Sequence, residues 1–122
     1  MAKLKIKWLD EPSNEDYPAA ESYLTLLYDE RTARVFLKQL KRAAVVSFKA
    51  KDIFRASGLM LLGGSDVHVA KDREKIKSGE KLSPLLLVRD SMHGRLIIAD
   101  GYHRLCAVYT YDEDATIPSK IV

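Results

Sequence analysis

Residues 96–109 read Leu-Ile-Ile-Ala-Asp-Gly-Tyr-His-Arg-Leu-Cys-Ala-Val-Tyr, and this stretch decides the fold. Its first four residues form an apolar run typical of a buried strand, and its last five read as a helix. Gly101 stands between them, so the sequence predicts a strand that passes directly into a helix at about residues 102–111. Such a turn aims the unpaired N–H groups of the helix at one point, beside the His103 imidazole and the Arg104 guanidinium. A point of this kind binds phosphate.

The neighbouring segments predict a small sheet. Apolar runs at 85–89 and 95–99 are joined by Asp-Ser-Met-His-Gly, which is a hairpin signal. Pro118, near the start of the run 117–122, suggests a strand that begins at a sheet edge. Upstream, Val-His-Val at 67–69 reads as a short strand, and Asp72 reads as the cap of a helix that stops at Gly79.

The first half of the chain predicts helices. An alternating start at 3–8 reads as a strand, an acidic loop follows at 10–16, and Asp29 can cap the second of two amphipathic helices. The apolar positions of these helices are Ala20, Tyr23, Leu24, Leu27 and Tyr28, then Ala33, Phe36, Leu37 and Leu40. An extended link at 45–48 and a helical turn at 51–57, closed by Gly58, come next. We therefore expect an α+β fold in one domain, 1–122, with a mainly helical part (1–65) packed on a small mixed sheet (66–122).

Composition excludes several classes of protein. Hydrophobic residues make up 47% of the chain and charged residues 30%, as in ordinary globular proteins. The apolar runs are too short to cross a bilayer, so we expect no membrane partner. Cys106 is the only cysteine, which rules out an intrachain disulfide and favours the cytoplasm. The net charge of +3 arises from interleaved basic and acidic residues, so DNA is not favoured as a partner.

Four segments, taken in order, resemble the ParB/sulfiredoxin superfamily. Residues 75–79 end a helix in Gly79, and residues 82–89 form a Pro-led strand that closes on Arg89. Residues 99–105 contain a Gly-x-x-Arg turn that opens a helix, where sulfiredoxins carry Gly-Cys-His-Arg. Residues 116–122 are similar to the closing strand of sulfiredoxins. The resemblance covers the chain from about residue 67 to its end.

The resemblance implies a ParB/sulfiredoxin-type α+β domain whose helix terminus holds nucleotide phosphates, from ATP in sulfiredoxins and from CTP in the ParB proteins of chromosome segregation. His103 and Arg104 match the phosphate-contacting pair of sulfiredoxin, and Lys75 and Ser78 resemble a Lys-x-x-Ser pair that also contacts nucleotide. The implied nucleotide-binding residues are Gly101, Tyr102, His103, Arg104, Lys75 and Ser78. The implied ligands are ATP, ADP, CTP or another phosphorylated small molecule, with Mg²⁺ as a companion. The sequence is also compatible with a homodimer.

The sequence departs from two of these families. Tyr102 stands where sulfiredoxin has its nucleophilic cysteine, and a phenol cannot replace a thiolate, so peroxiredoxin repair is not expected. Partition ParB proteins carry a helix-turn-helix domain after this fold, whereas this sequence ends at Val122, so we do not expect partition. The Asp-Gly-x-His-Arg turn is also similar to that of ParB-like free serine kinases, in which an N-terminal carboxylate is the base. Asp72 and Glu74 lie near the right region, but both read equally well as solvated helix residues.

Each candidate site residue also has a structural interpretation. Asp100 and His103 are candidates for catalysis, yet Asp100 could simply cap the helix and pair with Arg104. Tyr102 could contact a nucleotide or pack over the helix end. Cys106 reads as a small buried hydrophobe, and His68 as a solvated or structural residue.

Two further groups of residues are interpreted as ordinary. Lys51 and Arg55 could lie over the mouth of the site, but an ordinary basic helical turn is favoured. His93 sits in the hairpin, and the lack of a second His or Cys at ligand spacing predicts no metal site.

The leading hypothesis is therefore a nucleotide or phosphate site at Gly101–Arg104, in a small phosphotransferase or nucleotidase or in a nucleotide-gated switch. The alternative is a non-catalytic ParB-like protein-interaction module. A DNA-binding or nuclease-like accessory protein comes third.

Overall fold

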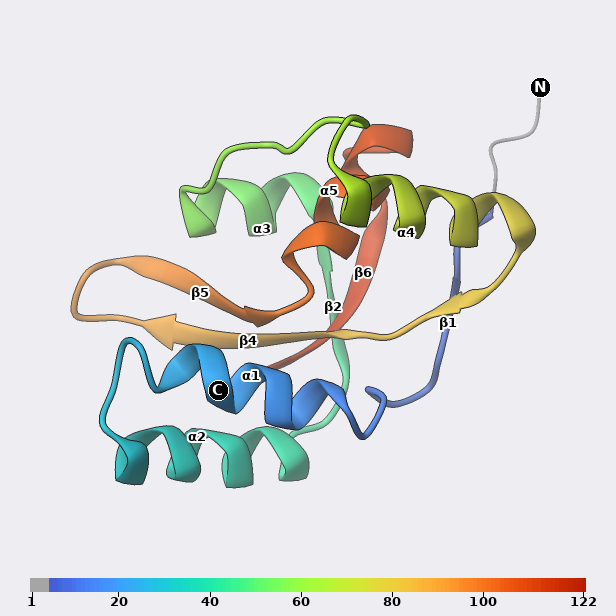
Figure 1. Cartoon of the computed structure of the whole chain (residues 1–122). Coiled ribbons are helices and arrows are strands. Elements are labelled where there is room, and N and C mark those ends of the chain that lie inside the picture. The colour runs from blue at the N-terminus through green and yellow to red at the C-terminus, as the bar shows by residue number, and fades with distance from the viewer. Residues whose placement is uncertain (1–4) are drawn as a thin grey trace.

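The computed structural model describes residues 5–122 and confirms an α+β chain with a mixed sheet (Figure 1). The helices are α1 (Asp16–Leu24), α2 (Glu30–Arg42), α3 (Ala50–Ser57), α4 (Val67–Ser78) and α5 (Tyr102–Tyr111). The strands are β1 (Lys7–Trp8), β2 (Val46–Lys49), β3 (Lys81–Leu82), β4 (Leu85–Asp90), β5 (Arg95–Asp100) and β6 (Thr116–Ile121). The predicted helix after the Gly101 turn is confirmed as α5. No helix within residues 5–122 is long and apolar enough to pass through a membrane.

The main sheet has the strand order β2-β6-β4-β5. The predicted β4–β5 hairpin is confirmed, and its register places Leu87 opposite Ile98. β6 runs antiparallel to β2 and, from Ser119 onward, parallel to β4, so its first residues have one unpaired side, as predicted for a strand that begins at an edge, and its later residues are interior. Pro118 is tolerated there because β4 joins β6 only from Ser119 onward. The separate pair β1–β3 is parallel.

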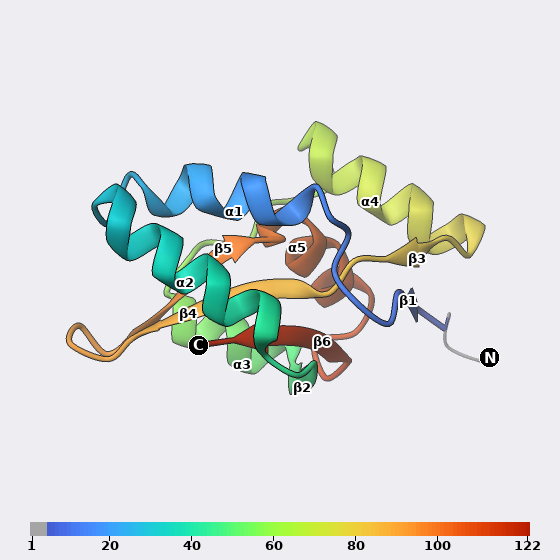
Figure 2. The same cartoon turned by 90° about the horizontal axis from the view of Figure 1, so that it is seen from below.

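The two faces of the sheet carry two separate cores. Leu86 and Val88 of β4 pack with α1 and α2, whereas Leu85 and Leu87 pack with α3, α4 and α5. This alternation follows from the two-residue period of a strand that is buried on both faces. Figures 1 and 2 show the resulting three layers, with α1 and α2 on one side of the sheet and α3, α4 and α5 on the other. The predicted N-terminal helical layer is therefore made of α1 and α2, while α3 belongs to the opposite layer.

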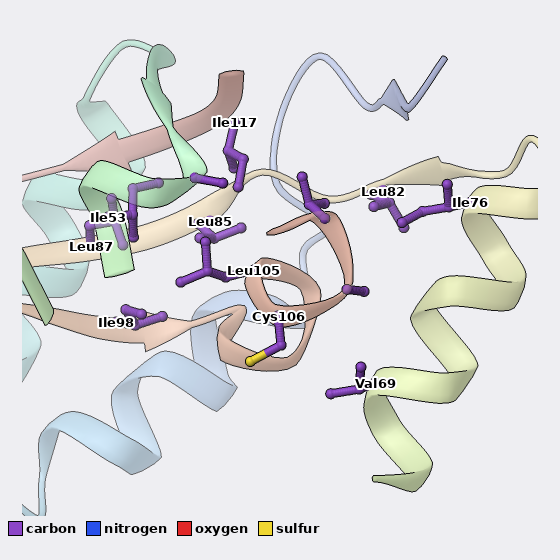
Figure 3. Close-up of a cluster of buried hydrophobic side chains, with 13 residues drawn as sticks. Ile53, Val69, Ile76, Leu82, Leu85, Leu87, Ile98, Leu105, Cys106 and Ile117 are labelled. Atoms are coloured by element: carbon purple, nitrogen blue, oxygen red, sulfur yellow. The ribbon is translucent and has the colours of Figure 1, made fainter. Parts of the chain in front are cut away.

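Figure 3 shows the core on the α5 side of the sheet. Leu105 and Cys106 of α5 and Val69 of α4 belong to this core, and all three are fully buried. Burial raises the pKa of the Cys106 thiol, which keeps it in its neutral form. The prediction that Cys106 is a small buried hydrophobe is confirmed.

The start of α4 corrects the sequence prediction for residues 67–69. These residues form the first turn of α4 rather than a strand. The cap is Asp66, not Asp72, because the Asp66 carboxylate accepts hydrogen bonds from the N–H groups of His68 and Val69 at 2.9 and 3.1 Å. The cap expected at Asp29 on α2 and the Gly58 stop after α3 are confirmed. Of the strand predicted at 3–8, residues 3 and 4 lie outside the described residues, and only Lys7–Trp8 pairs as β1.

Candidate functional site

The turn between β5 and α5 requires glycine at residue 101. Gly101 has φ 109°, and a Cβ atom placed there would come within 2.7 Å of Leu85 Cγ and 3.0 Å of the Arg104 guanidinium. Within residues 5–122 no side chain caps α5: Asp100 does not accept a hydrogen bond from the N–H groups of the helix, so the expected cap is wrong. The first turn of α5 is left open toward a polar cavity.

The cavity lies between the first turn of α5 and one face of α4. It has a volume of about 230 Å³, and its lining residues are His68, Lys71, Asp72, Lys75, Asp100, Gly101, His103 and Arg104. The four residues from α4 follow the spacing i, i+3, i+4 and i+7, which puts them on one helix face. Val69 and Ile76 of α4 are buried in the core, and the face with these four residues lies at the α5 terminus. A larger cavity of about 400 Å³, lined in part by Phe48, Ile53 and Ile121, lies away from this turn.

Arg104 is held by two carboxylates. Its Nη2 atom lies 2.9 Å from Asp100 Oδ2 and 3.6 Å from Asp16 Oδ2, and it donates at 3.4 Å to the carbonyl of Pro84. Asp16 in turn accepts a hydrogen bond from the Ser83 hydroxyl. The Arg104 side chain is 16% exposed, and its Nε is buried with no partner among the described residues. The guanidinium is therefore fixed in orientation at the edge of the cavity.

Two carboxyl groups of the cavity have pKa values above the ordinary range. Burial raises the pKa of Asp72, although Lys75 and Arg104 act against this. Burial also raises the pKa of Asp100, against the opposing effect of Arg104 and with the help of the Asp16 charge. Carboxyl groups whose pKa is raised in a cavity are candidates for proton transfer, because they accept a proton more readily than an exposed carboxylate does.

The formal charges of the site cancel when both imidazoles are neutral. Lys71, Lys75 and Arg104 supply three positive charges, and the three carboxylates near them supply three negative ones. The carboxylates are Asp16, Asp72 and Asp100. An anion therefore meets local N–H groups and ammonium groups but no excess of positive charge. Binding a polyphosphate here calls for a cation or for protons on the carboxylates and imidazoles.

Two histidines from different helices meet at the cavity. The ring centroids of His68 and His103 lie 4.8 Å apart, with His68 on α4 and His103 on α5. His68 was expected to be solvated or structural; it is exposed, but it lies beside the site. Among residues 5–122, no group of three or more His, Cys, Asp or Glu side chains is placed to hold a metal ion by itself.

The structure brings together four of the six residues expected to bind nucleotide. Gly101, His103, Arg104 and Lys75 line the cavity. Tyr102 does not, because its hydroxyl donates a hydrogen bond to the Met60 carbonyl in the loop before α4. Ser78 does not either: it is exposed at the end of α4, and its hydroxyl donates to the Lys75 carbonyl.

The candidate bases and the residues around α3 are also placed. Asp72 lines the cavity, whereas Glu74 lies 3.6 Å from Lys77 on the exposed side of α4. Lys51 pairs with Asp114 at 2.6 Å, Arg55 is 88% exposed, and neither lines the cavity, as expected of an ordinary basic helical turn.

Sequence reasoning missed three residues of the site. His68 and Lys71 were overlooked as lining residues because the start of α4 was read as a strand. A helix read from Asp66 would have placed both on the face that carries Lys75. Asp16 lies nearly ninety residues from Arg104 in the sequence, and no local signal indicated their contact.

Comparison with protein-family models, with curated proteins and with solved structures finds no match to this chain.

Proposed function

We propose that this chain binds the phosphates of a nucleotide at the first turn of α5. The observation that carries the proposal is the uncapped α5 terminus at Gly101, which opens into the same cavity as Lys71 and Lys75 of α4. Free N–H groups and the helix dipole attract one phosphate of the nucleotide. The ammonium groups of Lys71 and Lys75 can then contact the adjacent phosphates of a polyphosphate. The order α4, β3, β4, β5, α5, β6 supports a ParB/sulfiredoxin-type core, and that resemblance implies nucleotide at this turn.

A magnesium ion fits the donor set. Asp100 offers carboxylate oxygens at the cavity, and Mg²⁺ is usually bound by one or two carboxylates together with substrate phosphates. Bound there, the ion would offset repulsion between the carboxylates and the phosphates and would stabilise the charge on the transferred group. This requirement follows from the neutral formal charge of the site, so we expect nucleotide to bind with Mg²⁺ more tightly than without it.

We further infer transfer of the terminal phosphoryl group to a hydroxyl or to water. The acceptor oxygen forms a bond to the terminal phosphorus, the bond to the bridging oxygen breaks, and the nucleotide leaves with that electron pair and one phosphate fewer. The acceptor proton passes to a carboxylate, and Asp72 suits this step because it faces the cavity and its pKa is raised. Asp16, the other carboxylate near Arg104, suits this step less well, because Ser83 and Arg104 already engage it.

Thermal unfolding and phosphorus NMR test the two steps separately. ATP, ADP or CTP with Mg²⁺ should raise the melting temperature, since a ligand at about a hundredfold its Kd adds about 2.7 kcal/mol of stability. Lys71→Gln combined with Lys75→Gln should remove the rise. A flat response to every nucleotide would contradict binding. If nucleotide binds, new ³¹P resonances with free serine, other small alcohols or water would identify the acceptor.

An interaction module remains a second candidate because of the loop between α3 and α4. Leu59, Met60 and Leu61 of this loop are 43%, 82% and 48% exposed, and Val67 at the start of α4 is 75% exposed. These side chains lie beside the site, because Tyr102 holds the loop through the Met60 carbonyl. Exposed apolar clusters of this kind mark protein contacts. Self-association that Met60→Ser abolishes, in a chain that binds no nucleotide, would favour this candidate.

A further inference from the structure

Helix α2 carries a basic stripe, defined as Arg31, Arg34, Lys38, Lys41 and Arg42. At 100° per residue these five positions fall within an arc of about 100°. The opposite side of α2 holds Ala33, Leu37 and Leu40, which are buried against the sheet. Glu30, at the first residue, is the only acidic residue of the helix. The basic residues that look interleaved over the whole sequence are thus segregated on this helix.

The stripe is exposed and is not neutralised by the rest of the fold. All five side chains are exposed, and none forms an ion pair with a carboxylate in residues 5–122. Lys41 is the one member with a described contact through its ammonium group, which lies 5.7 Å from the centre of the Tyr17 ring. Figure 2 shows α2 on the outside of the molecule, with α1 as its neighbour in the layer and the sheet behind it. The opposite layer, across the sheet, holds α4 and α5 with the nucleotide cavity.

The geometry favours a nucleic acid over an anionic membrane. An interfacial helix binds lipid by inserting its apolar face, but the apolar face of α2 is already committed to the core. Successive members Arg31, Arg34, Lys38 and Arg42 rise by about 4.5, 6 and 6 Å along the helix. A regular row of cations, three of them guanidinium groups, suits the repeated phosphates of a nucleic-acid strand.

We propose that the basic stripe of α2 binds the phosphate backbone of a nucleic acid, without reading its sequence. The inference is independent of the nucleotide cavity, because the two surfaces lie on opposite layers and share no residue. Four or five phosphate contacts predict that affinity falls roughly 50- to 500-fold between about 50 and 200 mM salt.

Fluorescence anisotropy with a labelled 20-nucleotide oligomer, single-stranded or duplex, tests the proposal over a salt series. Arg34→Gln with Lys38→Gln should weaken binding about tenfold or more at low salt and lower the log–log salt slope by about 1.5 to 2. The matched control is Arg55→Gln with Lys77→Gln, which removes the same charge from exposed residues of α3 and α4 and should keep most of the affinity. Circular dichroism checks that both double variants are folded.

Three outcomes would overturn the proposal. They are an equal loss in the two double variants, no measurable binding of the wild type at about 50 mM salt, and polyglutamate or phosphatidylserine vesicles bound as tightly as the oligonucleotide. Polyglutamate stands in for an acidic protein, and the phosphatidylserine vesicles stand in for an anionic membrane. Lys75→Gln should leave oligonucleotide binding unchanged, which separates this surface from the nucleotide cavity.

Discussion

Gly101 sets the geometry of the turn at the scale of a single residue. Replacing it with Ala should lower the free energy of unfolding by about 2 to 4 kcal/mol, because a Cβ adds both a positive-φ penalty and a contact at 2.7 Å with Leu85. Gly94→Ala is the control: its φ is 61°, but nothing lies within 4 Å, so only the conformational penalty of about 1 to 2 kcal/mol applies. Urea unfolding measures both, and equal losses would contradict the close approach.

The buried carboxyl group of Asp72 gives the stability of the chain a particular pH dependence. Its pKa is raised from the ordinary 3.8, mainly by burial, so the folded chain holds this proton more firmly than the unfolded chain. From 3.8 up through the raised pKa, the wild type should therefore lose stability relative to Asp72→Asn as the pH rises.

Asp66 should give the stability of the chain the opposite pH dependence. Hydrogen bonds from the backbone, chiefly from the Val69 N–H, lower its pKa, so its contribution is present above 3.8 and is lost as the pH falls through the lowered value. Urea unfolding from about pH 3 to 7 should give opposite trends for Asp72→Asn and Asp66→Asn relative to the wild type. The same trend in both variants would rule out the burial argument for Asp72.

Sequence reasoning at this scale succeeded where the signal was local. Gly101, His103 and Arg104 are consecutive or nearly so, and a helix that opens at Gly101 brings them to one end. Tyr102 was assigned to the site for the same reason, but the second residue of the turn points to the Met60 loop instead. The placement of a first-turn side chain depends on what packs above the helix, which the local sequence does not contain.

Among the helices and strands, α4 supplies four of the eight residues that line the cavity. The Asp66 cap holds the first turn of this helix, which leads into the cavity residues His68 and Lys71. Asp66→Ala should cost about 1 kcal/mol of stability and should also weaken nucleotide binding, because fraying of the first turn displaces His68 and Lys71. Asp29→Ala removes the corresponding cap of α2 and should cost a similar amount with no effect on nucleotide.

Calorimetric titration with nucleotide, next to urea unfolding, compares these two cap variants. If nucleotide binds the wild type and both variants equally well, the start of α4 does not control the cavity.

The same element shows why an apolar pattern can mislead. Val-His-Val alternates over three residues, which fits a strand, but three residues are too few to distinguish a period of 2 from one of 3.6. The longer signals, at α2 and at the β4–β5 hairpin, predicted their elements correctly. The parallel pairing of β6 with β4 was not predicted, because the two strands are far apart in sequence and Pro118 suggested an edge.

The whole molecule is tied together through its sheet, which both cores share. Leu24 of α1 is fully buried on one face, and Cys106 of α5 is fully buried on the other. Leu24→Ala should cost about 2 to 5 kcal/mol, and if the chain unfolds as one unit, thiol labelling of Cys106 should report the same loss. Leu26→Ala, at a side chain that is 80% exposed, should change stability by less than about 0.5 kcal/mol.

Labelling of Cys106 in denaturant, compared with circular dichroism, makes this measurement. A Leu24→Ala variant that loses helicity while Cys106 stays protected would mean that the two layers unfold separately.

The central claim is that the α5 terminus and α4 hold nucleotide phosphates, and isothermal titration of the chain with ATP and Mg²⁺ tests it most directly. Three proteins are compared: the wild type, Lys75→Gln, which removes a cation from the cavity, and Lys77→Gln, which removes one from the exposed side of the same helix. We expect the wild type and Lys77→Gln to bind alike and Lys75→Gln to bind at least tenfold more weakly. No heat of binding in the wild type, or equal weakening in the two variants, would contradict the claim.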